Sequence, residues 1–147
     1  MYKRMLVPTD GSTTAAKAIK TAVGLAKAIG ATVVGYHAME PIDRAYYNAA
    51  AGISASQVRG LEKLLLTRGE RYLEAIRRAA DKAAVPWETL MTSPRAPYLG
   101  IIEAARAKRC DVICMTSHGR GAIASALLGS VTQQVLAHSK VPVLVCR

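Results

Sequence analysis

Short apolar runs alternate with amphipathic stretches along the chain. The first run, RMLVPTD at residues 4–10, is continuous and then breaks at a turn, as a buried parallel strand does. The segment 12–30 repeats small apolar residues at helical spacing and carries its lysines off that face. Ser12 or Thr13 can cap its start and Gly30 its end. This pattern predicts a strand followed by a helix.

The same alternation continues to the last residue. Further strands are predicted at 31–38, 86–92, 111–116 and 141–147. Further helices are predicted from a capping box, SASQ, at 54–57 to about residue 84, from Pro97 onward, and from a second capping box, SVTQ, at 130–133. The connection 39–53 has no regular spacing of apolar residues, and it could lie over a binding site.

Five strands that alternate with four helices indicate a single α/β domain over residues 1–147. We expect one doubly wound five-stranded parallel sheet of order 3-2-1-4-5, Rossmann-like, with helices on both faces. In such a sheet ligands bind beyond the carboxyl ends of the strands at the switch point, here between the first and fourth strands. The turns after these two strands, PTDGS and MTSHG, should therefore face each other.

The composition is that of a globular protein, with 51% hydrophobic and 20% charged residues. No apolar stretch has the length of a membrane span, and the start of the chain lacks the apolar core of a signal peptide. We therefore expect a cytoplasmic protein with no membrane partner. Three cysteines, Cys110, Cys114 and Cys146, are expected to be buried reduced thiols.

The chain carries 20 Lys and Arg against 10 Asp and Glu, a net charge of +10. Such a charge raises the question of nucleic-acid binding. The basic residues are scattered along the chain, Phe is absent and Trp occurs once. We therefore expect the basic residues to lie on solvent-exposed helix faces and not to bind nucleic acid. The positive charge could still raise the association rate of small anions.

The segment TSHGRGAIASALLGS, residues 116–130, interrupts the regular pattern directly after the fourth predicted strand. Its glycines let the backbone approach a ligand closely, and the helix beginning at Ser130 offers free N–H groups and the positive end of a dipole. Asp10, at the end of the first strand, could accept hydrogen bonds from an amino group or a ribose hydroxyl. The loop thus predicts an anion site, most simply for the phosphates of a nucleotide.

Other interpretations of this segment stay open. The glycines could serve only a tight turn. GRGAIA at 119–124 fits a dinucleotide fingerprint weakly, because no acidic residue follows about 20 residues later. Ser117 and His118 could form a nucleophile–base pair, but neighbours in a turn rarely point at one another and no G-x-S-x-G elbow is present. We expect His118 to line or cap the site.

The chain resembles the universal stress protein family over essentially its whole length. Nucleotide-binding members carry G-x-x-G, nine residues and then G-[ST] after the fourth strand. TSHG, RGAIASALL and GS match that spacing here, with Thr116 in place of the first glycine. VPTDGS near the start and PVLVCR at the end also resemble family signatures. The resemblance implies a domain that binds ATP or a related adenine nucleotide and forms homodimers through the last strand.

By position, the resemblance implies a base site near Pro8, Asp10 and Ala38 and a ribose site near Met115 and Thr116. The phosphates would be held by Gly119, Gly129, Ser130 and Val131, and the full predicted set also includes Thr9, His118, Arg120 and Thr132. If the backbone at Thr116 needed a positive φ, its branched side chain would be strained there.

Three functions compete at this point. The first is a nucleotide-binding regulatory protein of the stress response, and the second is a nucleotide-free dimeric scaffold of the same family. The third is a slow ATPase, for which the sequence offers no evident general base. A Mg²⁺ ion could accompany the nucleotide through phosphate oxygens and water, since no dedicated carboxylate pair is evident.

Overall fold

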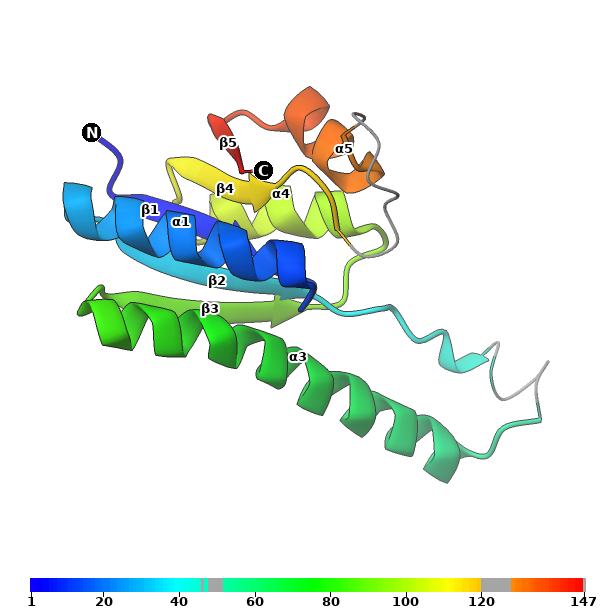
Figure 1. The fold of residues 1–147 in the computed structure, drawn as a ribbon. Coiled ribbons are helices and arrows are strands. Elements are labelled where there is room, and N and C mark those ends of the chain that lie inside the picture. The colour runs from blue at the N-terminus through cyan, green and yellow to red at the C-terminus, as the bar shows by residue number, and fades with distance from the viewer. Residues whose placement is uncertain (46, 48–51, 120–127, 147) are drawn as a thin grey trace.

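An open five-stranded sheet, parallel throughout, forms the middle of the molecule (Figure 1). The computed structural model describes residues 1–45, 47, 52–119 and 128–146. The strand order β3-β2-β1-β4-β5 confirms the predicted fold. In chain order the elements are β1 (Arg4–Pro8), α1 (Thr13–Ile29), β2 (Thr32–Ala38), α3 (Ala55–Ala83), β3 (Trp87–Thr92), α4 (Pro97–Ala107), β4 (Val112–Thr116), α5 (Ser130–His138) and β5 (Val143–Cys146).

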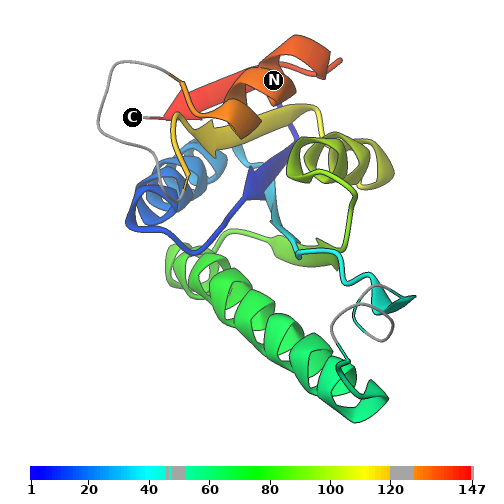
Figure 2. The ribbon, with the colours of Figure 1, turned by 90° about the vertical axis from the view of Figure 1, so that its right-hand side faces the viewer.

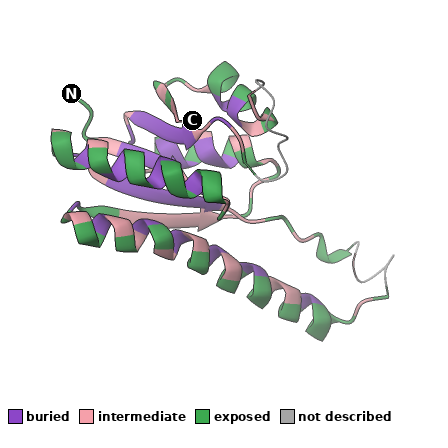
Figure 3. Cartoon of the chain, viewed as in Figure 1, coloured by how far each residue is buried: buried purple, intermediate pink, exposed green. Residues whose placement is uncertain are grey.

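The sheet is buried on both faces because two helices cover each of them (Figures 1 and 2). On β1, Met5 and Val7 point into the cluster under α1 and α3, while Leu6 points into the cluster under α4 and α5. Figure 3 shows the same pattern, with burial concentrated on the central strands. This two-sided burial explains why the strands read as continuous apolar runs.

The ends of two helices follow from short local signals. The Ser12 hydroxyl accepts a hydrogen bond from the Ala15 N–H at 3.1 Å, which confirms it as the cap of α1. Gly30 closes the same helix with a left-handed φ of 69°. At the start of α3, Ser54 and Gln57 exchange both bonds of the predicted capping box.

The strand register brings the functional segments to one edge of the sheet. Pro8, the last residue of β1, lies beside Tyr36 of β2. Thr116, the last residue of β4, lies beside Cys146 of β5. The turns that follow β1 and β4 therefore start from neighbouring strands at the same edge, as the sequence predicts.

Gly100 of α4 provides a test of this packing. A Cβ there would overlap the buried Tyr36 hydroxyl and come within 2.6 Å of the Pro94 ring. We expect Gly100→Ala to lower the free energy of unfolding by about 1–3 kcal/mol, the usual cost of overpacking. The control is Gly24→Ala in α1, where a Cβ meets nothing within 4 Å and removal of glycine should add about 0.5–1 kcal/mol. Urea denaturation measures both, and equal changes would contradict the packing described here.

Candidate functional site

A cavity of about 430 Å³ lies at the carboxyl edge of the sheet, the edge that faces the viewer in Figure 2. It is bounded by the ends of β1, β2 and β4 and by the first turns of α1, α4 and α5. The lining residues are Pro8, Thr9, Asp10, Ala15, Tyr36, His37, Ala38, Pro97, Ile101, Met115, Thr116, Gly119, Gly129, Ser130, Val131 and Thr132. The cavity lies at the switch point predicted from the strand order.

Most of the predicted site residues line this cavity. The exceptions are His118, which lies beside it but does not line it, and Arg120, which falls outside the described residues. Sequence reasoning missed five lining residues: Ala15, Tyr36, His37, Pro97 and Ile101. Pro97 had a usable signal, because a helix that follows β3 must begin at this same edge of the sheet.

The turn after β1 is held by short-range bonds. The Ser12 N–H donates to Asp10 Oδ1 at 3.0 Å, so this carboxylate is oriented by the chain that follows it. Gly11 takes a φ of 75°, and a Cβ there would overlap the Tyr72 ring. Glycine is therefore required at this position by both conformation and space.

The turn after β4 is braced by the start of α5. The Gly129 N–H donates to the Ser117 carbonyl at 2.8 Å, and the Thr132 hydroxyl donates to the Thr116 carbonyl at 2.9 Å. Thr132 is buried, so its hydrogen bond is shielded from water. These bonds fix the turn and the first turn of α5 as one unit.

Thr116, the departure from the family motif, fits without strain. Among the described residues only Ala84 and Arg109 are non-glycine residues with a positive φ. The Thr116 hydroxyl donates to the His118 carbonyl at 2.7 Å, and the Thr14 hydroxyl donates to the same oxygen at 3.2 Å. A side chain thus closes the turn at the motif's first glycine position.

The two turns approach each other at the cavity, as predicted. A Cβ on Gly119 would lie 2.8 Å from Asp10 Oδ2. A Cβ on Gly129 would lie 3.3 Å from the Ser117 carbonyl oxygen. Each glycine therefore permits a close approach that an L side chain would obstruct.

The predicted capping box at 130–133 is wrong. The N-cap of α5 is Gly129, no side chain caps the helix, and Gln133 instead donates through Nε2 to the Leu128 carbonyl at 2.9 Å. Ser130 is the first residue of the helix and not its N-cap, so its hydroxyl does not cap the helix. The amides of Ser130, Val131 and Thr132 belong to the first turn, where helix N–H groups have no intrahelical acceptor.

The helix ends add a positive potential at this edge. The first turns of α1, α4 and α5 meet the cavity, and none of them contains an acidic residue. Aligned peptide dipoles place partial positive charge at helix N-termini, so the ends reinforce one another. Asp10 is the one carboxylate among the described lining residues. The arrangement can hold an anion beside a single hydrogen-bond acceptor.

The expectation that Ser117 and His118 do not point at one another is also wrong. Ser117 Oγ lies 2.9 Å from His118 Nδ1. Ser117 is only 6% exposed, however, and neither residue lines the cavity. The short bond packs the turn, and the buried hydroxyl is poorly placed to attack a ligand there.

The β2 side of the cavity is less polar. Ala38, Pro8, Ile101 and Met115 contribute apolar surface. The buried His37 donates from Nδ1 to the Thr9 carbonyl at 2.9 Å, since a carbonyl oxygen can only accept. Tyr36 Oη bonds to Thr92 Oγ1 at 2.7 Å, and burial raises the pKa of this phenol. A flat apolar group would suit this side, opposite the amides of α5.

Metal centres and membrane-spanning helices are both absent from the described residues. No group of three or more His, Cys, Asp or Glu in that part of the chain could hold a metal ion. No helix there is both long and apolar enough to cross a bilayer. Cys110 and Cys114 are buried and Cys146 is half-buried, and all three are free thiols.

The fold and cavity define a class of protein: an open, doubly wound α/β domain with a cavity at its switch point. The universal stress protein family model matches residues 1–147, so the chain belongs to the universal stress protein family. A universal stress protein from Thermus aquaticus, from the QAH/OAS sulfhydrylase 3′ region, is 33% identical over 147 residues and is covered in full, as is this chain.

Solved structures of the family share the fold. The MJ0577 protein of Methanocaldococcus jannaschii superposes with a TM-score of 0.82 at 28% identity, over 99% of this chain and 95% of that chain. A universal stress protein in complex with cAMP gives a TM-score of 0.67 at 27% identity, over 99% and 97% of the two chains. One from Archaeoglobus fulgidus in complex with dAMP gives 0.72 at 17% identity, over 99% and 98%.

The brace between α5 and β4 makes a testable prediction. Thr132→Val keeps the side-chain volume but leaves the Thr116 carbonyl without its donor, which should cost about 1–3 kcal/mol of unfolding free energy. The matched control is Thr21→Val, where an exposed hydroxyl bonds to the Lys17 carbonyl at 3.1 Å and the loss should stay within about 0.5 kcal/mol. Urea denaturation measures both. A change no larger at Thr132 than at Thr21 would remove the brace from the description of the site.

Proposed function

We propose that this protein binds an adenine nucleotide, ATP or a close relative, in the cavity at the carboxyl edge of the sheet. The proposal is carried by one observation: the first turn of α5, which no side chain caps, lines the same cavity as Gly119, Gly129 and Asp10. The family relatives solved with cAMP and dAMP support the same ligand class. In this proposal the protein is a regulatory binding module of the stress response.

The proposal gives a role to each part of the cavity. The phosphates would accept hydrogen bonds from the amides of Gly119, Gly129 and the first turn of α5, where the helix dipole favours negative charge. The ribose would lie near Met115 and Thr116. The base would lie over the less polar β2 side, near Pro8, Thr9, Asp10 and Ala38, with Asp10 accepting from an amino group or a hydroxyl.

A Mg²⁺ ion would fit this site only through the nucleotide. Magnesium prefers oxygen ligands and keeps several waters, with one or two carboxylates at most. Asp10 is the single described lining carboxylate, and one of its oxygens already accepts from the Ser12 N–H. The same scarcity of carboxylates favours binding over rapid phosphoryl transfer, so any hydrolysis would be slow.

The alternative is a nucleotide-free scaffold, for which Thr116 is the motivation. That argument weakens once Thr116 is seen to adopt an unstrained backbone and to close the turn with its hydroxyl. A scaffold has no need for three helix N-termini free of carboxylates around a cavity. We therefore place nucleotide binding first.

The nucleotide proposal predicts the behaviour of Ser130→Asp. An aspartate in the first turn of α5 suits the helix dipole and should leave unfolding free energy unchanged or slightly raised. Its charge would stand where the phosphates bind, so ATP affinity should fall at least tenfold while neutral adenosine loses less. Isothermal titration calorimetry with both ligands measures this, together with mass spectrometry of small molecules released from the purified protein.

The control variant is Ser54→Asp, which places the same residue at the start of α3, away from the lining residues of the cavity. It should bind ATP as the unmodified protein does. If the unmodified protein carries no nucleotide and binds neither ATP, AMP nor cAMP, the proposal is overturned. Equal losses in both Asp variants would also reject the placement of the phosphates.

We also propose that two copies pair through β5. No described strand covers the outer edge of β5, and its side chains are apolar, with Leu144 38% exposed. The carbonyls of Pro142 and Cys146 accept from β4, so the backbone groups of Val143 and Val145 point to the open edge. An exposed apolar edge of this kind is a template for a second strand.

The variant Val145→Pro tests the pairing of two β5 strands, because it removes one backbone N–H, that of Val145. Proline removes the outward donor of Val145 without removing a bond between β4 and β5, so the monomer should keep its fold. Light scattering after size-exclusion chromatography should show a dimer for the unmodified protein and a monomer for the variant. A monomeric unmodified protein at micromolar concentration would refute the pairing.

A further inference from the structure

The net charge of +10 is larger than a site for one nucleotide requires, so the location of the cations in space matters. Helix α1 contains Lys17, Lys20 and Lys27 and no Asp or Glu. All three lysines are exposed. At 100° per residue they fall within about 80° of arc on the side opposite the buried alanines. The outer surface of α1 is therefore a row of positive charge.

Helix α3 carries a second row. Arg71, Arg78 and Lys82 are exposed and fall within about 40° of arc, opposite the buried Leu73 and Ile76. The row spans about 16 Å along the helix, and the three lysines of α1 span about 15 Å. The two helices lie side by side on the same face of the sheet (Figures 1 and 2).

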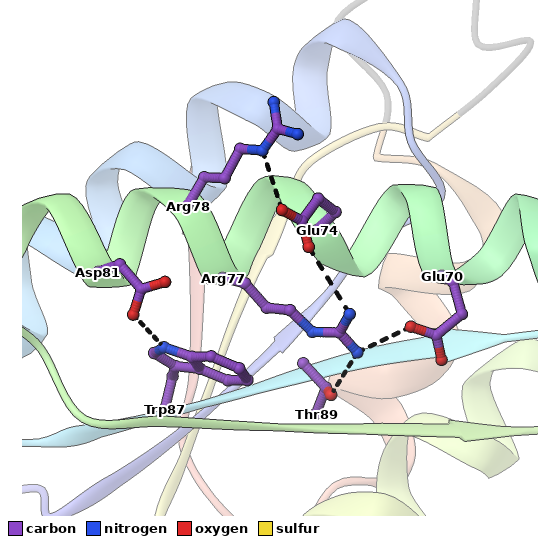
Figure 4. A network of polar contacts seen from close by, with 7 residues as sticks. All are labelled: Glu70, Glu74, Arg77, Arg78, Asp81, Trp87 and Thr89. Atoms are coloured by element: carbon purple, nitrogen blue, oxygen red, sulfur yellow. Dashed lines mark hydrogen bonds and ion pairs between the residues drawn. The ribbon is translucent and has the colours of Figure 1, made fainter.

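Two of the three carboxylates in residues 70–82, Glu70 and Asp81, are held on the other flank of α3, toward β3 (Figure 4). Glu70 accepts from Arg77 at 2.8 Å, and Arg77 also donates to Thr89 of β3 at 3.1 Å. On the same flank, Asp81 accepts from the indole N–H of Trp87 at 2.6 Å. These bonds keep negative charge away from the surface that α3 shares with α1.

Glu74 is the carboxylate closest to the cationic rows. It pairs with Arg78 at 2.9 Å and lies 3.7 Å from Arg77. In Figure 4 the Arg78 side chain extends away from β3, whereas Arg77 reaches toward Glu70 and Thr89. Glu74 is therefore the one carboxylate close to six exposed cations on the two helices. We call the surface formed by these cations the helix-pair face: Lys17, Lys20, Lys27, Arg71, Arg78 and Lys82.

Several other cations are already neutralised. Arg4 and Lys108 both bind Glu88, and the Lys108 hydrogen bond, with help from Arg4, holds the pKa of that carboxyl below its usual range. Arg44 and Arg68 pair with Glu62 and Glu40. Six of the twenty Lys and Arg residues therefore lie together on the helix-pair face, with Glu74 as the carboxylate beside them.

We propose that the helix-pair face binds double-stranded nucleic acid through its phosphates, without regard to base sequence. A duplex carries one charge per about 1.7 Å of axis, so a length of about 15 Å contains about nine phosphates, of which those on the near side would face the six cations. The axes of packed helices lie about 8–10 Å apart, so the two rows of cations are close enough to form one continuous positive surface. The inference does not rest on nucleotide binding, and it revises our expectation that these cations are merely solvated.

Other anionic partners fit this face less well. Insertion into a lipid surface requires exposed apolar side chains, and the large exposed ones among the described residues lie neither on α1 nor between residues 71 and 82 of α3. Single strands are usually held by aromatic stacking, and the face offers none. Small residues such as Thr21, Gly24 and Ala75 separate the cations, so a phosphate backbone can approach closely.

The experiment compares two triple variants with equal net charge. Lys20→Glu with Lys27→Glu and Lys82→Glu changes the helix-pair face. Lys3→Glu with Arg106→Glu and Lys140→Glu changes exposed cations elsewhere. Both sets alter last-turn helix cations, Lys27 and Lys82 in one and Arg106 in the other. Fluorescence anisotropy with two unrelated 20-base-pair DNA duplexes measures affinity between 50 and 200 mM KCl, and thermal melting with ATP calorimetry checks that each variant is folded.

The unmodified protein should bind both duplexes alike, with a slope of log affinity against log salt near −5 for six contacts. The face variant should lose at least tenfold in affinity at 50 mM KCl and reduce that slope by about 3, while the control variant loses clearly less. Equal losses in the two variants would mean that net charge alone attracts the duplex. Failure to bind at 50 mM KCl, or tighter binding of poly-L-glutamate of equal charge, would also overturn the proposal.

Discussion

Two hydrogen bonds between the start of α5 and the end of β4 determine the shape of the site. The donors, the Gly129 amide and the Thr132 hydroxyl, point back to the carbonyls of Ser117 and Thr116. A turn and a helix start that are joined in this way cannot move independently. The amides beyond Gly129 are therefore held in one orientation, which would reduce the entropy cost of binding the proposed ligand.

The second organising feature is the direction of the helices. Each helix runs back across the sheet, so its positive end lies at the carboxyl edge of the strands and its negative end at the amino edge. The four helices that the structure describes have no acidic residue in the first turn and a basic residue in the last: Lys27, Lys82, Arg106 and His138. Charge placement thus stabilises the helices and leaves their first turns, at the carboxyl edge of the sheet, without carboxylates.

The sequence predicted the fold well because both of its main signals are local. Continuous apolar runs marked the strands, and Ser12, Gly30 and the pair Ser54 and Gln57 marked helix ends through contacts within a few residues. The strand order placed Asp10 opposite the glycine turn, and the cavity has that arrangement. The nucleotide roles of the lining residues remain predictions.

The errors arose where a contact depends on exact backbone geometry. Ser130 matched a capping-box pattern, but the helix begins one residue earlier, so Gly129 occupies the cap. Ser117 and His118 are adjacent in a turn whose curvature, not its sequence, brings Oγ to Nδ1. Tyr36 and His37 line the cavity because β2 ends beside β1, a relation between distant segments that no local pattern contains.

The length of α3 has a consequence for how the molecule unfolds. This helix has 29 residues against 17 in α1, and its contacts with the core beneath the sheet come from its second half, through Leu73, Ile76 and Ala80. Val58 and Leu65, in the first half, are buried outside that core. Backbone protection against hydrogen exchange should therefore decline toward the start of the helix, so that one continuous helix contains a stable anchor and a readily opened end.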